Sequence, residues 1–306
     1  LWQTMDNQVM LADSFGSEAE AYFNAGEYER SLECSHQALQ ISEKIDNLWG
    51  QSYDRMLISF AYFESGQLGH GIQMVEQAIR LGDEAGLIAS NSLRSELAWI
   101  YAYCGAFEKS LKLIEQALQT ADAKQPAWRA FPQAGKVRMY LLQGDIGSAE
   151  QTAGNTLLQP ISIPYARYTI FVGLANIELA AARGEYRKAL ALSEELLDEV
   201  SHLVRVDVPE LLRWKGNALF ALGRLDEAHQ VLTEAFALAD TSGSNLHLWP
   251  ILTGLATVNS RLGNHNEARA NREKARQIVE TIADGLDELG LRESFLNQAR
   301  VQVLMR

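Results

Sequence analysis

The sequence has few cysteines and no long hydrophobic run. Its 306 residues include two cysteines, Cys34 and Cys104. They fall on different expected helices, farther apart than the roughly 7 Å between Cα atoms that a disulfide can bridge. We therefore expect reduced thiols and a cytoplasmic protein. The most apolar segment, 170–182, contains Asn176 and Glu178. It is too short to cross a bilayer, so the sequence predicts no membrane partner.

The sequence also has fewer basic than acidic residues. Lys and Arg number 27 against 39 Asp and Glu, which gives a formal net charge of -12. An acidic chain repels the phosphates of nucleic acids and of anionic membranes. We therefore expect no direct nucleic-acid partner, and a partner that is neutral or locally basic.

Patterns that carry chemistry are missing as well. The glycines occur singly, not in a phosphate-binding loop. The acidic pairs at 194–195 and 198–199 indicate a solvated helix face rather than catalytic carboxylates. The six histidines are scattered over the chain: His36, His70, His202, His229, His247 and His265. They never lie four residues apart with a carboxylate, so we expect solvated or turn histidines and no metal ligands. The sequence predicts a protein that is not an enzyme and needs no cofactor; an enzyme would require polar groups with shifted pKa values converging from distant parts of the chain.

The sequence does contain a repeat that occurs seven times. Its glycines recur every 39 or 40 residues, at Gly26, Gly66, Gly105, Gly144, Gly184, Gly223 and Gly263. In most copies an aromatic or apolar residue follows two places later and a small residue five places later, as Phe107 and Ser110 do in the third copy. A glycine can end a helix in the left-handed conformation, and small residues let neighbouring helices approach. The pattern predicts paired helices stacked into one continuous core.

These pairs define the expected fold. We expect an all-α, right-handed superhelical solenoid that forms a single repeat domain over residues 1–306, with a capping helix at 286–305. The seven expected pairs cover residues 9–45, 49–82, 90–122, 129–158, 165–200, 209–240 and 246–283. The chain begins at Leu1 rather than a methionine, and residues 2–10 lack a preceding partner helix. We therefore expect a fragment of a larger protein.

Three local features break the regularity of the array. Residues 82–86 are expected to be a connection, and Gly71 at the small position should loosen the second pair. Pro160 and Pro164 exclude a continuous helix at 160–164, which is either a rigid linker or a hinge. The segment 170–179 is apolar nearly all round, so it should be buried on more than one side.

The order of glycine, aromatic, small residue and alanine resembles the tetratricopeptide repeat (TPR). The third copy matches best, at Ala98, Tyr101, Gly105, Phe107, Ser110, Leu111, Ala117 and Leu118. The usual TPR period is about 34 residues, so this array is stretched. Stretched units of this kind are similar to the C-terminal regions of large bacterial signal-transduction ATPase regulators and adenylate cyclases, the maltose-regulator-like proteins.

The resemblance also implies a binding surface. In a TPR superhelix the first helix of each pair lines the concave side. The positions that face it in this chain are Tyr53, Phe60, Phe63, Trp99, Tyr103, Phe131, Arg138, Glu178, Arg213 and Asn217. Exposed rings in a concavity are typical of binding surfaces, although in a tightly wound array the same rings pack on each other. Some TPR domains hold a peptide C-terminus with basic and asparagine side chains, and here only Arg213 and Asn217 hint at that.

We therefore expect a noncatalytic binding module, the sensory or interaction region of a bacterial signalling or transcription regulator. Its concave side would take a peptide, a protein segment or a small-molecule effector. The alternative is a scaffold that self-associates without an effector, as a homodimer, through its end repeats or through the apolar segment 170–179.

Overall fold

The structure is a computed structural model that describes residues 7–87, 90–124, 126–154, 166–200 and 204–305. These residues form sixteen α-helices and two 3-10 turns, and they contain no strand. The elements are α1 (Gln8–Ala25), α2 (Tyr28–Lys44), α3 (Leu48–Glu64), α4 (Leu68–Glu84), α5 (Ser90–Tyr103), α6 (Phe107–Lys124), η1 (Pro126–Trp128), α7 (Ala130–Gln143), α8 (Ile146–Ala153), α9 (Ala166–Ala182), α10 (Tyr186–Val200), α11 (Val208–Ala221), α12 (Leu225–Ser242), α13 (Asn245–Leu262), α14 (His265–Asp284), η2 (Asp287–Leu289), α15 (Arg292–Leu296) and α16 (Ala299–Met305). The all-α solenoid of seven helix pairs is confirmed.

The turn between the helices of each pair is set by its glycine. All seven turn glycines have positive φ values, between 74° and 86°. At the first turn the amide of Gly26 donates to the Phe23 carbonyl at 2.9 Å, and the amide of Glu27 donates to the Tyr22 carbonyl at 2.9 Å. These two bonds satisfy carbonyl groups that the end of a helix otherwise leaves unpaired. A side chain with a Cβ would be strained at this φ, so the glycine period fixes the period of the fold.

The second repeat differs from its prediction. Helix α4 continues to Glu84, so residues 82–84 are helical and not part of a connection. Gly71 does not loosen the pair, because it lies directly against Phe63: a Cβ added at this glycine would be 2.4 Å from two carbons of the Phe63 ring. The prediction was wrong because helix propensity was weighed without the packing that the missing side chain permits.

Two other expectations concern the middle of the chain. Residues 160–164 lie outside the described residues. Helix α9 is buried on several sides, with Ile170, Val172 and Ile177 at most 1% exposed. The apolar character of this helix therefore serves packing inside the chain, as its sequence predicts. Among the described residues, no helix has both the length and the apolar character that a membrane span requires.

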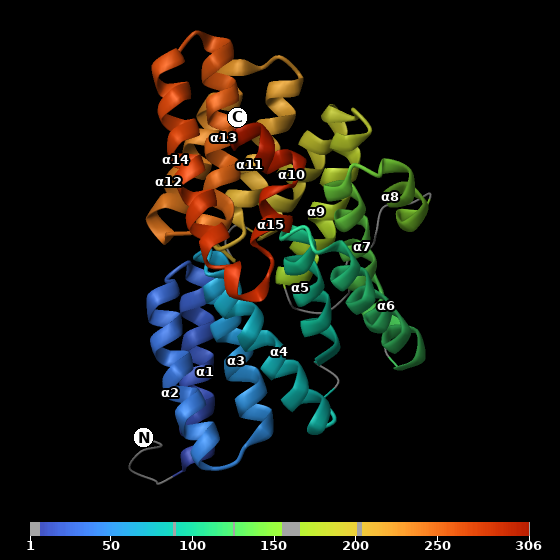
Figure 1. Cartoon of the computed structure of the whole chain (residues 1–306), viewed down its shortest axis with the longest axis vertical. Coiled ribbons are helices and arrows are strands. Elements are labelled where there is room, and N and C mark those ends of the chain that lie inside the picture. Colours follow the sequence, from blue (N-terminus) through green and yellow to red (C-terminus); the bar gives the residue numbers. More distant parts are fainter. Residues whose placement is uncertain (1–6, 88–89, 125, 155–165, 201–203, 306) are drawn as a thin grey trace.

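The array turns far enough for its last repeat to meet its early repeats (Figure 1). Helix α13 packs against α3. Asn245 Nδ2 donates to the Ser65 carbonyl at 3.0 Å, and the Tyr103 hydroxyl donates to the Leu246 carbonyl at 3.1 Å. Contacts between residues so far apart in sequence close the inner side of the solenoid.

The C-terminal segment 287–305 completes this closure, and it is not the single helix expected at 286–305. It forms η2, α15 and α16, and in Figure 1 its red ribbon lies next to α5. Ser294 Oγ donates to the Cys104 carbonyl at 3.0 Å, while Gln298 Nε2 and Arg300 Nη2 each donate to the Tyr103 carbonyl at 2.7 Å. Carbonyl groups at the end of α5 thus receive partners from the far end of the chain.

Candidate binding cavity

A cavity of about 590 Å³ lies on the inner side of the array. The first helix of each pair from the second repeat onward lines it, namely α3, α5, α7, α9, α11 and α13, and Arg300 of α16 adds to its wall. The charged lining residues are Glu64, Glu96, Arg138, Arg167, Glu178, Asp207, Glu210, Arg213, His247 and Arg300. The volume falls within the range of about 300–1,000 Å³ that is usual for small-ligand sites.

The repeat period explains how several of these residues meet. Trp99, Arg138 and Glu178 each lie six residues before the turn glycine of their own repeat. Equivalent positions of successive repeats stack side by side, so these three side chains form a row along the inner surface. The Arg138 guanidinium lies 3.7 Å from the centre of the Trp99 ring. On its other side it pairs with the Glu178 carboxylate.

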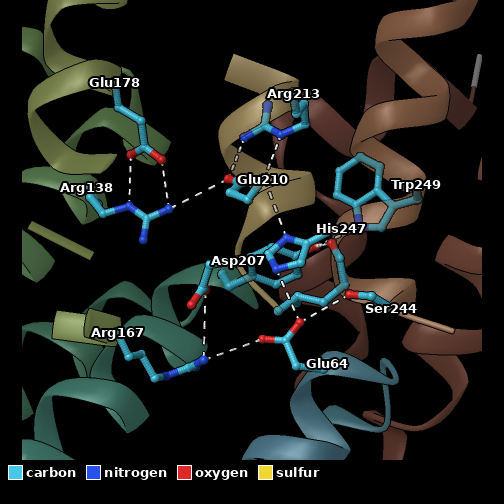
Figure 2. Close-up of polar contacts among 12 residues, drawn as sticks. Glu64, Arg138, Arg167, Glu178, Asp207, Glu210, Arg213, Ser244, His247 and Trp249 are labelled. Atoms are coloured by element: carbon cyan, nitrogen blue, oxygen red, sulfur yellow. Dashed lines mark hydrogen bonds and ion pairs between the residues drawn. The ribbon is translucent and has the colours of Figure 1, made fainter. Parts of the chain in front are cut away.

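Arg138 begins a chain of buried ion pairs (Figure 2). Its Nε and Nη2 donate to the Glu178 carboxylate at 3.0 and 2.7 Å. The same Nη2 lies 3.9 Å from Glu210 Oε1. Glu210 in turn accepts two hydrogen bonds from Arg213, at 2.7 and 2.6 Å. Parallel bonds of this kind fix both the position and the orientation of a carboxylate.

The chain continues through His247, at the start of α13. Its Nδ1 lies 3.5 Å from Glu210 Oε2, and its Nε2 lies 3.2 Å from Glu64 Oε2. Ser244 Oγ also donates to Glu64, at 3.1 Å. His247 therefore bridges α11 of the sixth repeat and α3 of the second, at the place where the array closes (Figure 2).

Arg167 forms the other end of the network. Its guanidinium lies 3.4 Å from Glu96, and 3.9 Å from both Glu64 and Asp207. It also lies over the Phe60 ring, 4.7 Å from the centre. Pairs separated by 3.9 Å are too far apart for a direct hydrogen bond, so Arg167 interacts with Glu64 and Asp207 through charge alone.

Burial and neighbouring charges shift the pKa values of this network. Burial lowers the pKa of His247, but Glu64 and Glu210 outweigh it and raise that pKa to about 10. Burial raises the pKa of Glu64, yet His247 and Arg167 together hold it below its ordinary value. Burial raises the pKa of Asp207 to about 6 against the opposing effect of Arg167. His247 is therefore a cation at neutral pH, and it lies between the carboxyl groups of Glu64 and Glu210.

Three buried polar atoms at the cavity have no hydrogen-bond partner among the described residues. They are Arg167 Nη1, Asp207 Oδ2 and Trp214 Nε1. All three residues line the cavity. Buried polar groups are normally hydrogen-bonded, so these atoms mark the places where a bound molecule or water would supply a partner.

A metal site was also considered for this cluster. Glu64, Asp207 and His247 offer donor atoms that lie within 4.8 Å of one another. However, the Arg167 guanidinium lies 3.9 Å from both carboxylates and already supplies positive charge at this point. The donor set therefore fits a divalent cation poorly.

Seven of the ten groove positions assigned from the sequence line the cavity: Phe63, Trp99, Tyr103, Arg138, Glu178, Arg213 and Asn217. The other three lie elsewhere. Tyr53 donates to Glu20 at 2.7 Å, Phe60 packs beneath Arg167, and Phe131 packs against Phe171 with ring centres 4.8 Å apart.

The aromatic cluster is buried rather than exposed. Phe63 and Phe131 are each 1% exposed, and Tyr103 is 5% exposed. Tyr103 stacks on Phe295 of the C-terminal segment, whereas Phe131 packs against Phe171 of α9 and Phe63 packs against Gly71 of its own repeat. The inner surface is therefore a cavity in which charged side chains lie among apolar and aromatic ones, not an open groove of exposed rings.

Several residues of the network escaped the sequence analysis. His247 was expected to be solvated, and this was wrong: it is buried between two carboxylates. Asp207 and Arg300 lie outside the groove positions of the repeat, and nothing in the sequence marks them. Arg167 did leave a signal, because an arginine in the first turn of an otherwise apolar helix must find a buried carboxylate.

Comparison with protein families finds a match between residues 1–243 and the MalT-like TPR region. No curated protein matches the chain. Among solved structures, a tetratricopeptide repeat protein from Parabacteroides merdae ATCC 43184 is 14% identical with a TM-score of 0.46, over 94% of this chain and 100% of that chain. NprR in complex with its cognate peptide NprX is 13% identical with a TM-score of 0.46, over 97% of this chain and 72% of that chain. The TPR2AB domain of yeast Sti1 in a pHSP90 complex is 13% identical with a TM-score of 0.34, over 94% of this chain and 97% of that chain.

Proposed function

The chain belongs to the MalT-like TPR region family, and on this basis we propose that it is a noncatalytic module that binds its ligand in the central cavity. TPR arrays commonly bind proteins or peptides and are generally not enzymes. In this proposal residues 1–306 act as one repeat domain, the sensory or interaction region of a cytoplasmic bacterial signalling or transcription regulator. The ligand is either the end of a peptide or a small effector.

The unsatisfied polar wall of the cavity carries this proposal. Arg167, Asp207 and Trp214 each keep a buried atom without a hydrogen-bond partner in the described part of the chain, although all three line one space of about 590 Å³. An unpaired buried polar atom costs about 1–3 kcal/mol, so a ligand that supplies the missing partners stabilises the closed array. The aromatic rings beside these atoms supply the apolar part of the contact.

Closure of the array also limits the size and shape of the ligand. Contacts between α13 and α3, together with the C-terminal segment on α5, bring the two ends of the inner surface together. An extended peptide that runs along several repeats needs an open groove. The closed form instead favours a compact ligand or the last few residues of a peptide.

Self-association through segment 170–179 is not favoured by any observation. Its residues Ile170, Val172 and Ile177 are at most 1% exposed in the single chain. A homodimer that used this face would first have to unfold the contacts between α9 and its neighbours.

The test compares two tryptophans. A library of short peptides and small polar molecules is screened by thermal shift, and the affinity of each hit is measured for Trp99→Ala and Trp49→Ala. Trp99 lines the cavity, whereas Trp49 is 48% exposed and lies outside its wall. Removing Trp99 should weaken binding by about 2 kcal/mol or more, while Trp49→Ala leaves it unchanged. Circular dichroism verifies that both variants stay helical, and equal affinity of every hit for both would refute the proposal.

A further inference from the structure

Arg300 differs from the other arginines of the cavity because no carboxylate lies within 4 Å of it among the described residues. Arg138 pairs with Glu178, Arg167 with Glu96, and Arg213 with Glu210. The hydrogen bonds of Arg300 to described residues go to neutral groups: Nη2 donates to the Tyr103 carbonyl at 2.7 Å, and Nε donates to Gln298 Oε1 at 3.3 Å. Its positive charge thus has no counterion within 4 Å in this part of the chain.

The position of this charge is fixed by two aromatic rings. The Arg300 guanidinium lies 4.1 Å from the centre of the Tyr103 ring and 5.3 Å from that of Trp249. Trp249 Nε1 donates to the Tyr103 hydroxyl at 2.6 Å, and that hydroxyl donates to the Leu246 carbonyl. The rings are thus tied to each other and to the backbone of α13, so they hold the guanidinium in one place without neutralising it.

The surroundings of Arg300 disfavour its charged form. Burial lowers the pKa of Arg300, and the nearby positive charge of Arg213 lowers it further. The negative charge of Glu210 opposes this effect, but Glu210 makes its hydrogen bonds to Arg213 and not to Arg300. The partly buried guanidinium of Arg300 can form two parallel hydrogen bonds with an oxyanion.

We propose that the ligand of the cavity carries an anionic group, a carboxylate or a phosphate, and that Arg300 binds this group. The inference rests on the proposed function, because it concerns the same cavity. Nη1 of Arg300 makes no hydrogen bond within the described part of the chain and is available to such a group. Two further donors at the cavity wall, Arg167 Nη1 and Trp214 Nε1, can donate hydrogen bonds to other oxygen atoms of the ligand.

Binding at Arg300 also ties the ligand to the C-terminal segment. Arg300 belongs to α16, and it joins this segment to the end of α5 through the Tyr103 carbonyl. A ligand that pairs with Arg300 while it contacts the inner helices holds α16 against the closed array. Occupancy of the cavity and docking of the C-terminal segment are then coupled, because each stabilises the other.

The first experiment titrates the full chain with inorganic phosphate, with succinate and with the neutral analogue succinamide. Sodium chloride keeps the ionic strength constant, and the thermal midpoint is recorded. Phosphate or succinate should raise the midpoint in a saturable way, whereas succinamide should not. A response to phosphate alone identifies a phosphate ligand, and a response to succinate alone identifies a carboxylate ligand. No saturable rise with either anion overturns the inference.

Three variants locate the effect. Arg300→Gln should weaken anion binding by about tenfold or more, since it removes a charged hydrogen-bond pair. Arg300→Lys keeps the charge and should retain part of the binding. The matched control is Arg224→Gln, an exposed arginine on the outer surface that pairs with Glu227, and it should bind like the unaltered chain. An equal midpoint rise in Arg300→Gln and in the control overturns the inference.

A measurement on the unaltered chain covers the case in which Arg300→Gln does not fold. The indole N–H signal of Trp249, whose ring lies beside Arg300, should shift in NMR spectra during the phosphate or succinate titration, while that of exposed Trp49 should not. Unshifted Trp249 at saturation refutes the proposal. If neutral compounds bind in a Trp99-dependent way and bind Arg300→Gln unchanged, the anion inference fails and the proposed function stands.

Discussion

His247 offers the most direct test of the buried network, because its charge can be titrated. Its imidazole lies 3.2 Å from Glu64 and 3.5 Å from Glu210, and its side chain is 11% exposed. Replacing His247 with Gln removes the positive charge that both carboxylates share and keeps a polar side chain of similar size. We expect the free energy of unfolding to fall, and the size of the fall to depend on pH.

The direction of this pH dependence follows from the pKa of His247 in the folded and in the unfolded chain. The folded chain holds the His247 pKa at about 10, against 6.5 for an unperturbed histidine. The folded state therefore binds this proton more tightly than the unfolded state does. The resulting stabilisation is fully present below pH 6.5 and is lost as the pH rises through 10. Between pH 6 and pH 8.5 the loss amounts to about 2.5 kcal/mol, at about 1.36 kcal/mol for each unit of pKa difference.

Urea denaturation at several pH values between 6 and 8.5 measures this contribution. Burial raises the pKa of Asp54 to about 7, so the unaltered chain also loses stability from this group as the pH rises. Both chains contain Asp54, and its effect cancels in their difference. The difference in unfolding free energy between the unaltered chain and His247→Gln should therefore shrink by about 2.5 kcal/mol over this range. A difference that stays constant with pH would refute the reasoning.

Two further predictions concern packing and pairing. Gly71→Ala should lower the free energy of unfolding by about 1–3 kcal/mol, because the new Cβ would lie 2.4 Å from the Phe63 ring. Gly147→Ala, in the open first turn of α8, should raise it by about 0.5–1 kcal/mol. Arg138→Met should cost about 3–5 kcal/mol by leaving the Glu178 charge buried and unpaired, and the double variant that adds Glu178→Leu should recover most of that loss. Urea denaturation at one pH measures all four chains, and an Arg138→Met effect that the second substitution leaves unchanged would contradict the pairing.

Much of the architecture could be predicted from local sequence because local rules determine it. A glycine with positive φ ends the first helix of each pair, and this requirement repeats every 39 or 40 residues. The row formed by Trp99, Arg138 and Glu178 follows from the same period. Helix α9 was also predicted correctly, since an apolar surface on all sides leaves only burial as an outcome.

Closure of the array could not be predicted in the same way. It depends on the small rotation that each repeat adds, and no single residue encodes this sum. The contact between Tyr103 and Leu246 joins residues 143 positions apart, and the contact between Gln298 and Tyr103 joins residues 195 positions apart. His247 was misjudged for this reason: on α13 alone it faces no partner, and only the closed array places Glu64 beside it.

The charged wall costs stability that an apolar wall would not. Taking charges out of water is expensive, and a buried ion pair is often no better than the hydrophobic pair that could replace it. The array nevertheless lines its inner surface with ten charged side chains, and nine of them lie within 4 Å of an opposite charge. Arg300 is the tenth, and it is also the one that the C-terminal segment contributes. A ligand that neutralises Arg300 would lower the cost of the wall only when that segment is docked, so the charge that has no partner among the described residues lies where ligand binding can act on the closure of the fold.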